Sequence, residues 1–225
     1  MAKYKKRKAR ARGIAETYIH IKDVPRDLSL EKARLYLEKN ARYWARSKFG
    51  PSIEVSVRVE EGSLKTWVLV GGTSIFNLVV NYGEIRDGID HLVSDSRDFS
   101  EHVIESFESD NHIPDAAIAR TERRLGIPGK IKRFYSDIDN LNSDDLSANE
   151  RADEIDRLQA EFLEIIDLMP NPDDKQIFID AIEFEEDVPF EFPNNLPRFG
   201  LPGRVPEAPR RDVPRLNRLG RDEDT

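Results

Sequence analysis

The sequence predicts a helix-rich α+β protein, and two periodicities predict it. Between residues 53 and 70, apolar residues alternate with polar ones, which is the period of a half-buried β-strand. Over most of the stretch from 74 to 184, apolar residues recur every three or four positions, which is typical of amphipathic helices. We therefore expect a small mixed sheet, built as strand, helix, hairpin and long helix, followed by a run of amphipathic helices and flanked by flexible termini.

Composition divides the 225 residues into four parts. We expect a basic disordered arm over 1–13, an α+β core over 14–112, a helical segment over 113–187 and an extended Pro/Arg-rich tail over 188–225. The length suffices for a hydrophobic core without disulfides. The chain has no cysteine, which excludes a cysteine-ligated zinc site, an iron–sulfur cluster and a thiol nucleophile.

Three strands are predicted in the core. The first covers 16–24, where apolar and polar residues alternate until Pro25 ends the pattern. The other two cover 53–59 and 64–70, and Gly62 between them can adopt the positive φ of a tight hairpin turn. A helix that starts after this turn is the alternative, but the β-branched residues of the second segment favour a strand.

Two helices accompany these strands. Ser29 is a suitable N-cap for a helix that ends near Lys48. This helix has a modest basic face, which could meet an acidic partner or, as we prefer, the acidic rest of the body. Its residues are Arg34, Lys39, Arg42, Arg46 and Lys48. After the hairpin, an apolar stripe predicts one long helix over 74–107, in which Gly83 and Gly88 mark a kink or, as we prefer, a close packing contact.

The order of strand, helix, strand, strand and helix is most of a split β-α-β unit, as in ferredoxin-like folds. A fourth strand would complete such a fold, and 177–192 is the only candidate that the pattern offers. The exact topology therefore stays open.

The helical segment contains four predicted helices: 114–125, 130–141, one from Ser143 or Ser147 to Met169, and 173–184.

Charge is unevenly distributed along the chain, whose net charge is −8. The stretch 13–197 carries 21 basic and 38 acidic residues, so this body should repel DNA and membrane phosphates. Residues 1–12 carry seven basic residues and no acidic one. We interpret this arm either as a solvated tail that aids solubility or as a nucleic-acid-binding arm. The residues that would bind are Lys3, Lys5, Lys6, Arg7, Lys8, Arg10 and Arg12.

The C-terminal tail from Pro189 onward contains seven Pro and seven Arg with little periodicity. It is either a disordered tail or a docking segment that becomes ordered on a partner, because apolar residues are spaced through it. The partner-binding candidates are Phe199, Leu201, Val205, Arg210 and Arg211.

One pattern resembles a catalytic or metal-binding site. Asp87, His91, Asp95 and His102 lie about one or two turns apart on the predicted long helix, and His with Asp can perform acid–base chemistry. However, His91 and His102 would lie ~16 Å apart along a helix, so they cannot share one ion. A charged helix face also shows such spacings by chance. No phosphate-binding loop or nucleophile elbow is present, so we expect no metal and no cofactor.

These observations rank three functions. The first is a non-catalytic interaction or assembly protein, whose amphipathic helices and tails bind a protein partner or a second copy. The second is a nucleic-acid-associated protein, and the third is an enzyme centred on the Asp and His residues. The apolar block 67–82 is too short and too polar for a membrane span, and the start of the chain does not resemble a signal peptide, so we expect a cytoplasmic protein.

Overall fold

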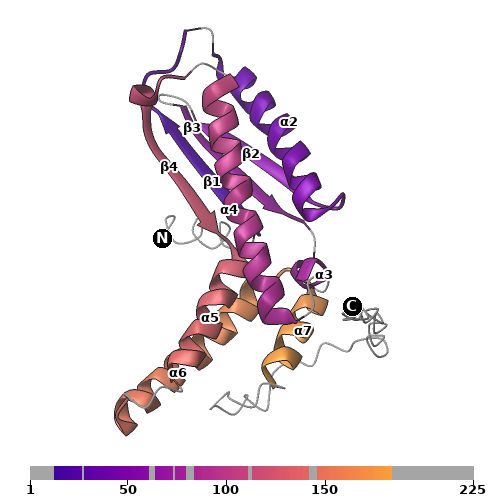
Figure 1. Ribbon diagram of the computed structural model, residues 1–225, viewed down its shortest axis with the longest axis vertical. Coiled ribbons are helices and arrows are strands. Elements are labelled where there is room, and N and C mark those ends of the chain that lie inside the picture. Colours follow the sequence, from indigo (N-terminus) through magenta and orange to yellow (C-terminus); the bar gives the residue numbers. More distant parts are fainter. Residues whose placement is uncertain are drawn as a thin grey trace, which may run out of the picture.

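The computed structural model describes residues 13–26, 28–60, 64–72, 74–79, 84–110, 113–141 and 146–183. It confirms the helix-rich α+β class (Figure 1). The elements are, in order, β1 (Ala15–Ile21), α2 (Leu30–Phe49), β2 (Glu54–Glu60), β3 (Leu64–Gly71), α3 (Ile75–Val79), α4 (Ile85–Asp110), the 3-10 turn η2 (Asp115–Ala117), β4 (Ile118–Leu125), α5 (Ile127–Leu141), α6 (Ala148–Leu168) and α7 (Pro172–Glu183).

The four strands form one sheet in the order β2-β3-β1-β4, and every pairing is antiparallel. Tyr18 of β1 lies opposite Trp67 of β3 on one side and opposite Glu122 of β4 on the other. The predicted hairpin is confirmed as β2 and β3, although its turn at 61–63 lies outside the described residues. With β4 in place, the chain follows the β-α-β-β-α-β order of ferredoxin-like folds.

The fourth strand corrects two predictions. The stretch 114–125, predicted as a helix, forms β4 along most of its length, and 177–183, offered as a strand, lies in α7. Alanine and arginine dominate 114–125 and favour a helix locally, but pairing along the whole of β1 outweighs this preference. Because β4 is an edge strand, its charged side chains also protect the sheet from further pairing.

The predicted single helix over 74–107 is wrong, because two helices, α3 and α4, occupy this stretch. Residues 80–83 between them, with Gly83, lie outside the described part. The preference for packing at Gly88 is right: a Cβ atom there would lie 2.4 Å from Val79 Cγ1 and 2.8 Å from the Val79 carbonyl oxygen. Glycine therefore allows the first turn of α4 to approach the end of α3.

Helices α2 and α4 cover one face of the sheet, and α4 extends past the sheet to the group formed by α5, α6 and α7 (Figure 1). The alternation of β1 directs Thr17 and Ile19 toward this layer, where the Thr17 hydroxyl donates to Ser100 Oγ of α4 at 3.0 Å. The apolar stripe of α4 is buried here. Its fully buried members include Ile89, Leu92, Phe99, Val103 and Phe107.

Beyond the sheet, four phenylalanines from four helices form the centre of the packing. Phe178 of α7 contacts the other three, with ring centroids 5.4 to 6.2 Å apart. These are Phe76 of α3, Phe134 of α5 and Phe162 of α6. All four rings are buried and belong to the same hydrophobic cluster as the sheet layer. The core is therefore continuous from the sheet into the helical group.

Helix boundaries follow the predicted caps closely. The Ser29 side chain accepts a hydrogen bond from the Lys32 amide, and Ser147 forms a capping box with Glu150 at the start of α6. The alternative cap, Ser143, lies outside the described residues. Helix α5 begins at Ile127 rather than at residue 130, since Pro128 is accepted in a first turn.

Asp174 of α7 connects two distant parts of the chain. Its carboxylate is only 1% exposed and accepts hydrogen bonds from the Ser74 hydroxyl and from the amides of Ile75 and Phe76, at 2.9 and 3.2 Å for the two amides. Asp174 therefore caps α3 from another helix. This buried carboxylate fixes α7 to the N-terminus of α3 and satisfies amide groups that have no partner within the helix.

The second face of the sheet carries an aromatic pair. The rings of Tyr18 and Trp67 lie 5.1 Å apart, with the guanidinium of Arg124 over Tyr18 and that of Arg58 over Trp67.

Among the described helices, none combines the length and the apolar character that crossing a membrane requires.

Candidate functional site

The structure places the four Asp and His residues that were predicted as weak catalytic candidates along α4, and two of them contact α2. Asp95 binds Lys48 of α2 at 3.1 Å, and the His102 ring lies against Trp44 of α2, with centroids 3.7 Å apart. Asp87 and His91 are exposed near the start of α4. Within the described residues, no group of three or more His, Cys, Asp or Glu side chains is placed to hold a metal ion.

Asp95 and His102 instead attach α4 to α2. The Lys48 ammonium forms an ion pair with Asp95 and, at 3.6 Å, a second ion pair with Asp98. The hydrogen bond to Asp95 is the largest contribution that raises the pKa of Lys48 above its usual value, and the nearby charge of Asp98 adds to it. The packing of α2 on α4 is therefore sufficient to explain the positions of these side chains.

The two terminal predictions fall outside the described residues. The proposed nucleic-acid-binding residues are Lys3, Lys5, Lys6, Arg7, Lys8, Arg10 and Arg12. The proposed partner-binding residues are Phe199, Leu201, Val205, Arg210 and Arg211.

Helix α2 has one side fixed against the core. Its buried residues recur every four positions and are mostly alanine, which lets the helix lie close to the sheet: Ala33, Leu37, Ala41, Ala45 and Phe49. Polar contacts with α4 fix its rotation, because the Tyr36 hydroxyl donates to the Ser106 carbonyl at 3.0 Å and the Asn40 amide donates to Ser106 Oγ at 2.6 Å. The side chains on the opposite side of α2 must therefore face outward.

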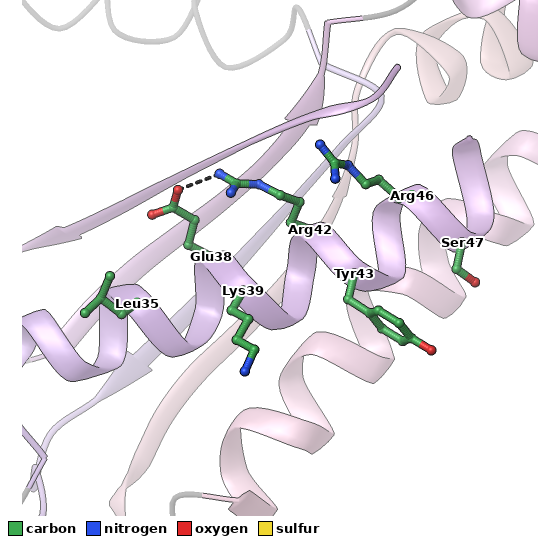
Figure 2. Close-up of a pocket in the computed structure, with 7 residues that line it drawn as sticks. All are labelled: Leu35, Glu38, Lys39, Arg42, Tyr43, Arg46 and Ser47. Atoms are coloured by element: carbon green, nitrogen blue, oxygen red, sulfur yellow. Dashed lines mark hydrogen bonds and ion pairs between the residues drawn. The ribbon is translucent and has the colours of Figure 1, made fainter. Parts of the chain in front are cut away.

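This outer face of α2 is the candidate functional site. It borders an open hollow of about 670 Å³, lined by Leu35, Glu38, Lys39, Arg42, Tyr43, Arg46 and Ser47. Leu35 is 52% exposed and Tyr43 is 70% exposed, and both rank among the few large apolar side chains that the described part leaves in solvent. Figure 2 shows the seven side chains spreading from one helix, with Lys39 and Tyr43 projecting to the same side.

The basic residues of α2 differ in how their charge is used. Arg34 binds Glu31 and Glu38 on the same helix, and Glu38 also accepts a hydrogen bond from Arg42 at 2.6 Å. The hydrogen bond from Arg34 holds the pKa of Glu31 below its usual value.

Two further cations on this face are not paired with a described carboxylate. Within the described part of the chain, the side chains of Lys39 and Arg46 take part in no ion pair or hydrogen bond. The outer face of α2 therefore combines two exposed apolar side chains with two uncompensated cations.

Sequence reasoning found the basic residues of α2 but assigned their charge to the acidic body and missed the apolar pair. Lys48 does contact the body through Asp95 and Asp98. The available signal was the position of Leu35 and Tyr43, which fall off the buried stripe and lie two helical turns apart between basic residues.

Comparison with protein-family models, with curated proteins and with solved structures found no match.

Proposed function

We propose that this chain is a non-catalytic interaction protein that binds a protein partner through the outer face of α2. The observation that carries the proposal is the exposure of Leu35 and Tyr43 beside the uncompensated charges of Lys39 and Arg46. Tyrosine and arginine are the residue types that supply much of the binding energy at protein interfaces. Large exposed side chains on an otherwise well-packed helix gain free energy when a partner covers them.

The partner that fits this face carries acidic residues together with apolar side chains. Lys39 and Arg46 would bind its carboxylates, while Leu35 and Tyr43 would pack against its apolar groups. The acidic body around α2 would repel the same partner elsewhere, so the charge pattern also favours one binding position over others.

Assembly through the stripe of the long helix is not part of this proposal. The stripe residues of α4, such as Phe99 and Val103, are used inside the chain. A second copy could still bind, by placing its acidic surface on α2. The molar mass in solution tests this arrangement: a concentration-dependent mass above 25.9 kDa that the α2 variants abolish would identify the partner as a second copy. The cytoplasmic location inferred from the sequence stays part of the proposal.

A defined peptide tests the α2 site directly. The probe is a fluorescent helical peptide with glutamate on one side and leucine and phenylalanine on the other, and fluorescence anisotropy reports its binding to the full chain. We expect saturable binding that weakens with salt. Leu35→Ala with Tyr43→Ala should weaken it at least about tenfold, since each truncated anchor at an interface typically costs ~1–2 kcal/mol.

The matched control is Leu163→Ala on α6, because Leu163 is 43% exposed and lies on another helix. This variant should bind the peptide as the parent chain does. Lys39→Glu with Arg46→Glu should weaken binding and reverse its salt dependence, because added salt then screens a repulsion. Equal binding by the parent chain and both α2 variants would reject the site.

A second candidate function, binding of single-stranded nucleic acid, is supported by the second face of the sheet. Tyr18 and Trp67 lie on the two central strands, and the guanidinium groups of Arg58 and Arg124 lie over their rings. Because Tyr18 is only 9% exposed, an unpaired strand would stack its bases on the half-buried Trp67 ring and on the guanidinium planes. Since the basic arm precedes β1 by only a few residues in the sequence, it could add contacts to phosphate.

Deletion of residues 1–12 and the separate substitution Trp67→Ala test this candidate with a fluorescent oligonucleotide. Under this hypothesis the deletion lowers both the affinity and its salt dependence, while Trp67→Ala lowers the affinity and leaves the salt dependence in place. Absence of oligonucleotide binding by the parent chain at low salt would reject it.

A further inference from the structure

A basic cavity lies where the sheet layer meets the helical group. It has a volume of about 440 Å³ and is bordered by α4, β4 and α5. Four of its described lining residues are cationic, and none of them is acidic: Arg97 of α4, Arg123 of β4, and Lys132 and Arg133 of α5. The Ser136 hydroxyl and the Leu125 side chain also line it.

Two of these cations are held by carboxylates that do not line the cavity. Glu101 accepts a hydrogen bond from Arg123 Nη2 at 2.6 Å and forms an ion pair with Arg123 Nε, and Asp90 binds Lys132 at 2.7 Å. Such pairs orient the long side chains without filling the cavity with negative charge.

The other two cations are not neutralised by a described carboxylate. Arg133 donates only to the Gly129 carbonyl, at 3.4 Å, and the side chain of Arg97 takes part in no ion pair or hydrogen bond among the described residues. The cavity therefore keeps about two uncompensated positive charges.

This charge pattern differs from that of two other hollows in the described body. One hollow is lined by Arg157 together with Glu150, Asp153 and Glu154. Another places Arg86 and Lys132 beside three aspartates. In a stretch with a net charge of −17, four converging cations with no acidic lining residue repel one another, and an anion in the cavity would relieve that repulsion.

We propose that this cavity binds a small molecule bearing two or more phosphate groups. Guanidinium groups match phosphate oxygens with two parallel hydrogen bonds, and three of the four cations are arginines. Two uncompensated charges call for more than one negative charge on the ligand, and Ser136 offers a further donor. A volume of about 440 Å³ lies within the usual range for small-molecule sites. Leu125 provides an apolar wall for a non-phosphate part, such as a nucleoside.

Calorimetric titration of the full chain with inorganic tripolyphosphate and with ATP tests the proposal. We expect saturable binding of tripolyphosphate that weakens as salt is added. Arg97→Ala with Arg133→Ala should weaken it at least about tenfold, because each lost charged hydrogen bond is worth more than one factor of ten. Arg97→Lys with Arg133→Lys keeps the charge and should retain part of the affinity. Tighter binding of ATP than of tripolyphosphate would assign a nucleotide, and equal binding would assign the phosphate chain alone.

The matched control is Lys39→Ala with Arg46→Ala on α2, which removes two uncompensated cations elsewhere. Both positions changed in the cavity are exposed, so thermal unfolding should show that the variants keep the parent fold. Equal loss of binding in the cavity variant and in the control would show a general charge effect and overturn the site. Absence of binding of both ligands at millimolar concentration would overturn it as well. So would binding of an oligonucleotide through Arg97 and Arg133 without binding of tripolyphosphate.

Discussion

Replacing Asp174 should destabilise the whole fold although the residue lies far from either candidate site. The carboxylate is buried and accepts three hydrogen bonds, from the Ser74 hydroxyl and from the amides of Ile75 and Phe76. Asp174→Ala removes the acceptor for all three donors at once. The packing of α7 against α3, including the contact of Phe178 with Phe76, depends on the position that this carboxylate fixes.

The size of the effect follows from the number of donors left without an acceptor. Each buried donor that loses its partner costs about 1–3 kcal/mol, and entry of water into the gap recovers part of that sum. We therefore expect a loss of roughly 3–5 kcal/mol in the free energy of unfolding for Asp174→Ala. In a protein of this size the midpoint of thermal unfolding falls ~2–4 °C per kcal/mol, so it should fall by roughly 10 °C. Asp174→Asn keeps one acceptor oxygen and should lose about half as much.

Urea unfolding followed by circular dichroism, together with calorimetry, measures this loss. Asp173→Ala is the matched control, because Asp173 is the neighbouring acidic residue in the first turn of α7 but is exposed. Its loss should stay below ~1 kcal/mol, which is the value of a charge at an exposed helix N-terminus. A stability of Asp174→Ala equal to that of Asp173→Ala would refute the role of this buried carboxylate.

Two further predictions concern α4 and β1. Gly88→Ala should lower the free energy of unfolding by about 1–2 kcal/mol, because overpacking against the backbone of Val79 outweighs the gain in helix propensity; a more stable variant in urea unfolding would contradict the close contact. The pKa of His20, followed by NMR, should lie below its ordinary ~6.5, because partial burial and then the charges of Lys65 and Lys22 disfavour the protonated ring. Since this pKa is lower in the folded than in the unfolded chain, stability should decrease as pH falls from ~6.5 through the folded value. Lys65→Ala should raise the His20 pKa, and an unchanged value would show that the Lys65 charge has no such effect.

The α2 site and the basic cavity can be tested independently, because they involve different elements. Leu35 and Tyr43 lie on α2, whereas Arg97 and Arg133 lie on α4 and α5. Substitutions at separate sites without shared partners have additive effects. A variant altered at one site should therefore retain the binding of the other.

Much of the sheet layer could be predicted from local patterns. Strands β1, β2 and β3 show clear alternation, and the burial of Ile19 and Val68 agrees with the predicted faces. The serine caps of α2 and α6 lie where the sequence places them, since capping depends on residues three positions apart. The basic residues on the outer face of α2 could also be predicted. Which of them lack an ion pair could not be predicted, because ion pairing depends on which neighbours reach each side chain.

Contacts between distant segments account for the predictions that failed. Helix-favouring residues at 118–125 form β4 because β1 offers a full row of hydrogen-bonding partners, which no local pattern records. Gly88 of α4 approaches Val79 of α3, and Asp174, 100 residues after Ser74, accepts from the first two amides of α3.

The candidate sites divide in the same way. The sequence by itself determined the helix-rich α+β class, the strand faces and the excess of acid in the body, since these depend on composition and local periodicity. Only the tertiary structure placed Asp95 and His102 against α2, exposed Leu35 beside Tyr43, and brought Arg97, Arg123 and Arg133 to one cavity. These arrangements join side chains from separate elements or depend on which side of a helix the core covers. Both conditions are set by packing across the whole chain.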